Sequence, residues 1–246
     1  MATFEQESSN TAPASIPSDE VTEYKTTYDD KEYFIYRSPD YNDAKPKPPF
    51  HNDKKMMKVM LNILDTKVDC FVETGSFMGK TIYFVGKNFP KLACYSCELE
   101  PEYYRISNAE VKDLPNVKLE CVPSPNAVYN IHKNFDSEIY EKKCLFWLDA
   151  HWKTDPLYAE LLYITKNYKH FIIFIDDFTV PGDDGFWSDG YDIAKIKRFI
   201  YKKETLKYYM PNYSSSDEAC KDNACGYIII TNMDFETFDN VKEITI

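Results

Sequence analysis

The sequence predicts an α/β protein built on a mainly parallel β-sheet. From residue 51 onward, strand-like segments alternate with helical segments, which is the pattern of a sheet with helices on both faces. Residues 144–148 and 171–175 are apolar throughout, as strands buried on both faces are. A glycine-bearing turn, 73–79, joins the first strand to a helix, as in sheets that hold nucleotide-like ligands. The length of 246 residues suits one such domain with an extension.

The elements follow in order from His51. Asn52 or Asp53 can cap a first helix, because Met56, Met60, Ile63 and Leu64 recur at helical spacing. Late strands can form an antiparallel edge, and a tyrosine-rich segment near 205–213 is not assigned to an element. The remaining expected elements are strand 68–73, helix 79–88, strand 92–98, helix 101–112, strand 117–122, helix 125–135, strand 144–148, helix 156–168, strand 171–175, helix 191–203 and strand 227–231.

Residues 1–50 differ in composition from the domain expected over 51–246. They are rich in Ser, Thr, Pro and acidic residues, so we expect a largely flexible N-terminal extension. The aromatic cluster 33–36 should nevertheless dock on the domain. Two interpretations stay open, a tail pinned to the domain surface and a lid, 31–41, over the active site.

Charge and cysteine content exclude some classes of function. The formal net charge of −11 argues against a nucleic-acid partner, which requires a basic face. The absence of a long apolar run or an export signal predicts a cytoplasmic protein without a membrane span. The seven cysteines are therefore expected as free thiols, and Cys220 and Cys225 are interpreted as loop cysteines rather than disulfide partners or metal ligands.

Two ligands compete for the turn after the first strand. Gly75, Lys80 and Thr81 are similar to a phosphate-binding P-loop, but one residue of the required spacing is missing. Glu98 follows the second strand about 20 positions after the turn, where a ribose-binding carboxylate belongs. A carboxylate accepts hydrogen bonds from ribose hydroxyls and repels phosphate, so a nucleoside ligand such as S-adenosylmethionine is favoured.

Three carboxylates end the two fully apolar strands. Asp149 follows strand 144–148, and Asp176 and Asp177 follow strand 171–175. Like charges at adjacent strand ends cost free energy unless a cation joins them. Oxygen ligands favour a hard divalent ion, Mg²⁺ or another such as Mn²⁺. The alternative is that these aspartates cap helices and face water.

These motifs resemble those of class I S-adenosylmethionine-dependent methyltransferases, specifically the Mg²⁺-dependent O-methyltransferases of the catechol and sugar types. The resemblance covers roughly residues 55–200. It is carried by Glu73-Thr-Gly-Ser-Phe-Met-Gly79, Cys97-Glu98-Leu-Glu-Pro, Leu148-Asp149-Ala-His151-Trp152-Lys153 and Asp176-Asp177-Phe-Thr-Val-Pro181-Gly182. It implies a Rossmann-like fold with a mainly parallel seven-stranded sheet, helices on both faces and an antiparallel edge strand.

The resemblance also implies roles for individual residues. The metal would be held by Asp149, Asp176 and Asp177, and either His151 or Lys153 would be the base that takes the substrate proton. The acceptor pocket would include Trp152, Pro181, Trp187 and Tyr191. The cofactor S-adenosylmethionine would be bound by Glu73, Gly75, Ser76, Gly79, Glu98, Ser124 and Asp149.

The expected function is therefore metal-dependent methyl transfer to a hydroxyl of a vicinal diol. Polar residues in the loop 181–191 favour a sugar or glycan acceptor, and a catechol-type small molecule is the alternative. From other classes, a P-loop-like ATP-dependent kinase and a non-catalytic binding module stay as rivals. The sequence leaves the oligomeric state open, a homo-oligomer included.

Overall fold

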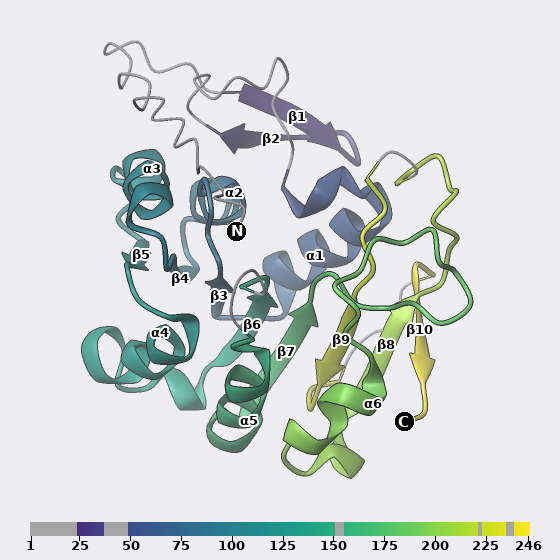
Figure 1. The fold of residues 1–246 in the computed structure, drawn as a ribbon. Coiled ribbons are helices and arrows are strands. Elements are labelled where there is room, and N and C mark those ends of the chain that lie inside the picture. Colours follow the sequence, from purple (N-terminus) through teal and green to yellow (C-terminus); the bar gives the residue numbers. More distant parts are fainter. Residues whose placement is uncertain (1–23, 37–48, 151–154, 221–222, 235–238) are drawn as a thin grey trace, which may run out of the picture.

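The computed structural model describes residues 24–36, 49–150, 155–220, 223–234 and 239–246. These residues build an eight-stranded sheet of order β10-β8-β9-β7-β6-β3-β4-β5 (Figure 1). Strand β9 is antiparallel to both β7 and β8, β10 is antiparallel to β8, and the other strands run parallel to one another. The strands span Cys70–Thr74 (β3), Ala93–Cys97 (β4), Val117–Glu120 (β5), Lys143–Leu148 (β6), His170–Ile175 (β7), Lys207–Pro211 (β8), Ile228–Thr231 (β9) and Val241–Ile244 (β10).

Helices cover both faces of the sheet. Helices α1, α2 and α3 lie on one face, and α4, α5 and α6 lie on the other (Figure 1). They span Lys54–Thr66 (α1), Lys80–Asn88 (α2), Pro101–Val111 (α3), Ser124–Asn130 (α4), Leu157–Asn167 (α5) and Ile193–Ile196 (α6). Short turns of other helix types cover Phe50–Asn52, Ile131–Phe135, Ile139–Glu141, Lys197–Phe199 and Lys203–Thr205.

The apolar strands β6 and β7 form the centre of the core. Their side chains alternate between two buried clusters, so that Trp147 and Phe174 pack with α1 and α2 while Phe146 and Ile173 pack with α4 and α5. This alternation follows from the period of two along a strand. The predicted α/β class, with a mainly parallel sheet and helices on both faces, is confirmed.

Three details depart from the prediction. The helix expected over 191–203 is α-helical only at Ile193–Ile196, because the chain turns to a tighter helix and then to the left-handed residue Lys202. The unassigned tyrosine-rich segment forms β8, which is hydrogen-bonded between β9 and β10. The sheet has eight strands rather than seven, and the antiparallel strand β9 lies inside it, between β7 and β8, while β10 is the antiparallel edge strand.

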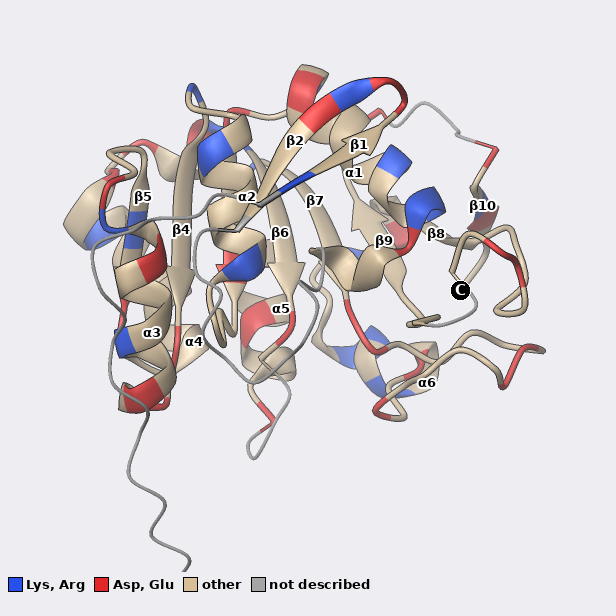
Figure 2. Ribbon diagram, turned by 90° about the horizontal axis from the view of Figure 1, so that it is seen from above, with Lys and Arg blue, Asp and Glu red and all other residues tan. Residues whose placement is uncertain are grey.

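A β-hairpin precedes the sheet in sequence and packs on α2. Its strands are β1 (Tyr24–Tyr28) and β2 (Lys31–Tyr36), and it lies across α2 when the molecule is seen from above (Figure 2). The ring of Tyr33 lies 5.7 Å from that of Phe84, and Asn88 bonds both backbone groups of Phe34. The described part of the expected 31–41 lid is thus docked on α2.

Charged groups are distributed over the described surface. Lys and Arg lie on separate elements, among them α1, α2 and α6 (Figure 2). Every helix in the described part of the chain is too short or too polar to cross a bilayer.

Replacing Asn88 by Ala should loosen the hairpin. The Asn88 side chain accepts from Phe34 N at 2.9 Å and donates to Phe34 O at 2.7 Å, and the substitution leaves both groups unpaired. We expect the free energy of hairpin opening to fall by about 1–3 kcal/mol. Hydrogen exchange at the Phe34 amide should accelerate accordingly. Asn167→Ala, which removes a bond to Tyr163 O within α5, is the matched control and should leave this amide unchanged.

Candidate functional site

The loop between β3 and α2 contacts the end of β6 so closely that it requires glycine. Gly75 has a φ of +82°, in the left-handed region that glycine adopts without strain. A Cβ atom at this position would lie 2.6 Å from the carbonyl oxygen of Asp149. The Gly75 amide donates to the Cys97 carbonyl at 3.2 Å, which ties the loop to β4 as well. The missing Cβ of Gly75 therefore lets the loop pack directly against the chain after β6.

Ser76 and Gly79 hold the same loop against helix α3. The Ser76 hydroxyl donates to Ser107 Oγ at 3.1 Å, and a Cβ at Gly79 would lie 2.9 Å from Ser107 Cα. Gly79 has a φ of +78° and is the residue directly before α2. The positive end of the helix dipole of α2 thus lies at this loop, where it favours an anionic ligand group.

The Glu98 carboxylate lies beside the loop, in a fixed orientation. Its Oε2 accepts from the Phe77 amide at 2.8 Å, and its Oε1 accepts from the Glu100 amide at 2.9 Å. Each carboxylate oxygen has a further lone pair, so both can still accept from ribose hydroxyls. Phe77, half exposed with its ring 4.5 Å from that of Tyr103, forms an apolar wall next to this carboxylate.

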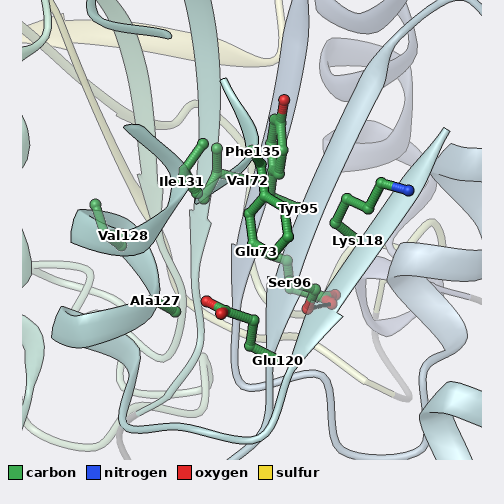
Figure 3. Close-up of a pocket in the computed structure, with 10 residues that line it drawn as sticks. All are labelled: Val72, Glu73, Tyr95, Ser96, Lys118, Glu120, Ala127, Val128, Ile131 and Phe135. Atoms are coloured by element: carbon green, nitrogen blue, oxygen red, sulfur yellow. Dashed lines mark hydrogen bonds between the residues drawn. The ribbon is translucent and has the colours of Figure 1, made fainter. Parts of the chain in front are cut away.

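Glu73 lies below the loop in a buried position. Ser96 Oγ donates to Glu73 Oε2 at 2.5 Å, and burial raises the pKa of Glu73 to about 8. The residue lines a cavity of about 10 Å³, whose walls come from β3, β4, β5 and the region of α4 (Figure 3). Such a volume holds about one water molecule. Glu73 is therefore part of the floor of the site, and its burial favours the neutral form of its carboxyl group.

Ser124, the remaining predicted cofactor residue, begins α4 and is buried. It lies beside Glu160, a fully buried residue of α5 that the sequence patterns did not single out. Burial raises the pKa of Glu160 to about 7, and the hydroxyls of Ser124 and Thr74 oppose that rise. The floor of the site thus contains a second buried carboxyl group, whose two oxygens have no hydrogen-bond partner among the described residues.

The carboxylates after β6 and β7 form the acidic end of the site. Asp176 is fully buried, and its Oδ1 has no hydrogen-bond partner among the described residues. Burial and the charge of Asp176 raise the pKa of Asp177 to about 6 and hold that of Asp149 well above its usual range. The three carboxylates thus lie close enough for the charge of one to raise the pKa of another, in line with the expected clustering at this edge of the sheet.

Two residues that the sequence patterns missed join this end of the site. The ligand atoms of His51, Asp176, Asp177 and Cys225 all lie within 4.8 Å of one another. His51 Nε2 donates to Asp176 Oδ2 at 2.6 Å, and Cys225 Sγ donates to Asp177 Oδ1. Asp149 lies outside this set of four. Burial lowers the pKa of His51, but Asp176, Asp149 and Asp177 outweigh it and raise that pKa to about 10.

A strained turn places His51 in the site. Phe50, His51 and Asn52 all have φ between +51° and +58°, which is costly for residues other than glycine. Phe50 is buried, with its ring 5.0 Å from that of Trp147. Asp53 then caps α1 by accepting from two amides, and it also accepts from the Tyr213 hydroxyl. No spacing rule connects His51 to the aspartates, so no sequence pattern identifies it as a site residue.

The loop after β7 forms one wall of an open cleft of about 490 Å³. Trp187, 66% exposed, lines this cleft together with His51, Asp177 and Cys225. Tyr191 is buried and donates to Asp155 at 2.8 Å, so it supports the loop from below. Pro181 is exposed in the turn that follows β7 and is not among the lining residues. The predicted residues His151, Trp152 and Lys153 lie outside the described residues.

Comparison with known proteins identifies the fold. No protein-family model matches the chain, and no curated protein matches its sequence. The plantazolicin methyltransferase BamL, solved with SAH and a triazolic desmethylPZN analog, superposes with a TM-score of 0.51 at 10% identity, covering 75% of this chain and 86% of that one. The O-methyltransferase from Bacillus cereus, solved with SAH, has a TM-score of 0.49 at 15% identity, covering 71% and 78%. At such low sequence identities, structural similarity shows the fold alone. The superposition on BamL, with its TM-score of 0.51, identifies a Rossmann-like methyltransferase fold.

Replacing Gly75 by Ala should disrupt the contact between the loop and β6. Gly182→Ala is the matched control, because Gly182 has a φ of +85° with no atom near its missing Cβ. The control should lower the free energy of unfolding by about 1–2 kcal/mol, the cost of the left-handed backbone. Gly75→Ala should lower it by about 1–3 kcal/mol more because of the clash with Asp149. Equal values in chemical denaturation would show that the loop can move away from β6.

Replacing Glu73 by Gln should change how stability depends on pH. The folded protein holds the Glu73 proton up to about pH 8, whereas the unfolded chain releases it near the ordinary pKa of 4.5. The stability from this group is therefore complete below pH 4.5 and falls by up to about 1.4 kcal/mol per pH unit as the pH rises to 8. The gain of Glu73→Gln over the original protein should grow across this window in denaturant titrations. A constant difference would mean that Glu73 is ionised in the fold.

Proposed function

We propose that this protein is an S-adenosylmethionine-dependent O-methyltransferase that uses a divalent cation and methylates a hydroxyl of a vicinal diol. The contact between Gly75 and the Asp149 carbonyl carries this proposal. The loop between β3 and α2 would bind the methyl donor. Through this contact, the loop lies directly beside the end of β6, which carries Asp149. The donor and an acceptor hydroxyl oriented by the acidic end would therefore meet at one edge of the sheet, as transfer requires.

The residues of the loop fit S-adenosylmethionine. Gly75 and Gly79 let the loop pack directly against Asp149 and Ser107, and the positive end of the α2 helix dipole would face the amino-acid carboxylate of the cofactor. The fixed Glu98 carboxylate suits the ribose hydroxyls and would repel the phosphates of ATP. Bound there, S-adenosylmethionine would supply a methyl group on a positively charged sulfur.

The acidic end fits a divalent cation. The Asp176 Oδ1 atom is a buried acceptor without a donor among the described residues. The pKa values of Asp149 and Asp177 are raised by burial and then by the charge of Asp176, and a cation would relieve that repulsion. Three carboxylates alone would select Mg²⁺ or Mn²⁺. A bound divalent ion would lower the pKa of a substrate hydroxyl.

The cleft supports a sugar or glycan acceptor over a catechol. The exposed Trp187 ring offers a face on which a sugar ring can stack, and it lies in the same lining as Asp177 and Asn223. Hydroxyl-rich acceptors need such polar neighbours around an aromatic surface. His151 and Lys153 keep the role of base that the resemblance implies.

Removing divalent ions should abolish methyl transfer and leave cofactor binding intact. The assay follows methyl release from S-adenosylmethionine with panels of sugars, nucleotide sugars and catechols, before and after EDTA and after restoring Mg²⁺, Mn²⁺ or Zn²⁺. We expect Asp176→Ala to behave like EDTA treatment, because the buried Asp176 carboxylate would hold the ion. Full activity in EDTA would refute metal dependence.

The Glu98→Gln variant should impair cofactor binding, the property that removing divalent ions leaves intact. Loss of a charge-assisted hydrogen bond should weaken S-adenosylhomocysteine binding about 10-fold or more in calorimetry. A thermal shift with ATP but not with S-adenosylmethionine would instead favour the kinase function.

A further inference from the structure

We infer that His51, Asp176, Asp177 and Cys225 bind a zinc-class divalent ion through nitrogen, oxygen and sulfur ligands. The inference deepens the proposed function and rests on it for the use of the ion in methyl transfer. Binding of the ion is measured separately from transfer.

The geometry of the four side chains is close to that of a tetrahedral site. Their ligand atoms lie within 4.8 Å of one another. With zinc–ligand distances of about 2.0–2.3 Å, tetrahedral ligand atoms lie roughly 3.3–3.8 Å apart. Side-chain shifts of about 1 Å therefore bring all four atoms onto one ion. The hydrogen bonds His51–Asp176 and Cys225–Asp177 would open in exchange for metal bonds.

An unpartnered oxygen points to a ligand at this place. Asp176 is fully buried, and while its Oδ2 accepts from His51, its Oδ1 has no partner among the described residues. A buried carboxylate oxygen left unpaired costs free energy. A cation bound to this carboxylate would remove the cost.

The chemistry of the ligands selects the class of ion. Imidazole nitrogen and thiolate sulfur favour borderline ions such as Zn²⁺, whereas Mg²⁺ takes oxygen ligands. His51 and Cys225 would thus convert a carboxylate site for Mg²⁺ into a site for Zn²⁺. A metal ion also stabilises the thiolate of a coordinating cysteine.

Both additional ligands are held by their surroundings. Cys225 lies in a segment paired with Trp187, through bonds from Trp187 N to Ala224 O and from Gly226 N to Trp187 O. A Cβ at Gly226 would lie 2.0 Å from the Phe178 carbonyl oxygen, so this segment packs directly against the chain after β7. The buried neighbour Phe50 anchors the turn that carries His51.

The site opens to the cleft on one side. His51, Asp177 and Cys225 line the cleft, while Asp176 closes the site from below. An acceptor hydroxyl in the cleft can therefore reach a fifth position on the ion, an expansion that zinc permits.

The test uses the full chain, freed of metal by chelator and titrated with Zn²⁺, Co²⁺ and Mg²⁺. We expect saturable binding of one Zn²⁺ or Co²⁺ that excess Mg²⁺ does not displace. The Co²⁺ form should show the near-ultraviolet thiolate-to-cobalt absorption band. Cys225→Ser should abolish the band. His51→Asn should weaken Zn²⁺ by more than the roughly 10–100-fold that loss of an outer-shell partner causes.

The variants are matched to the structure. Asn tolerates the left-handed backbone of residue 51, so His51→Asn removes the ligand without disturbing the turn. Cys220→Ser is the control for Cys225→Ser, because Cys220 is equally buried and bonds the carbonyls of Ser214 and Asp217 instead. It should keep the absorption band. X-ray absorption of the Zn²⁺-loaded original protein adds a measurement without mutation and should show a sulfur ligand at about 2.3 Å.

Cobalt binding without the thiolate band, or unchanged Zn²⁺ affinity in both ligand variants, would overturn the inference. Displacement of Zn²⁺ by Mg²⁺, or the absence of saturable binding, would do the same. Failure of the proposed function is a separate result, seen as absent S-adenosylhomocysteine binding in a protein that still binds zinc.

Discussion

The burial of carboxylates at one edge of the sheet is the constraint around which the rest of the site is arranged. Parallel strands end at the same edge, so Asp149 after β6 and Asp176 after β7 are forced together. Asp176 is fully buried and Asp149 partly buried; burial and the charge of Asp176 raise the pKa of Asp149. The fold must therefore bring positive charge to this edge, and in the described structure His51 supplies it.

The turn that brings His51 to this edge has a strained backbone. Three left-handed residues, 50–52, cost roughly 1–2 kcal/mol each by steric contact of Cβ with the backbone. Burial of the Phe50 side chain returns about 1.5–3 kcal/mol, and the Asp53 cap returns about 1 kcal/mol. The strain is thus offset nearby, and the start of the domain is fastened to the carboxyl edge of the sheet. The Tyr213–Asp53 hydrogen bond fastens the segment after β8 to the same place.

The central part of the fold was predictable because its signals are local. The apolar runs 144–148 and 171–175 specify strands buried on both faces, and Asp53 specifies the start of α1. The later part was less predictable because its structure depends on distant partners. Residues 207–211 become β8 by pairing with β9 and β10. The helix expected over 191–203 is α-helical only to residue 196, because the chain tightens over 197–199 and Ile200 is extended.

The sequence by itself determined the sheet class, the glycine turn at Gly75 and which carboxylates end β6 and β7, since each follows from neighbours along the chain. Tertiary structure alone decided that His51 and Cys225 join those carboxylates. His51 lies 125 residues from Asp176, and Cys225 lies 48 residues from Asp177. No periodicity or spacing relates residues so far apart. They meet only because the strained turn and the segment after β8 both pack onto the carboxyl edge of the sheet.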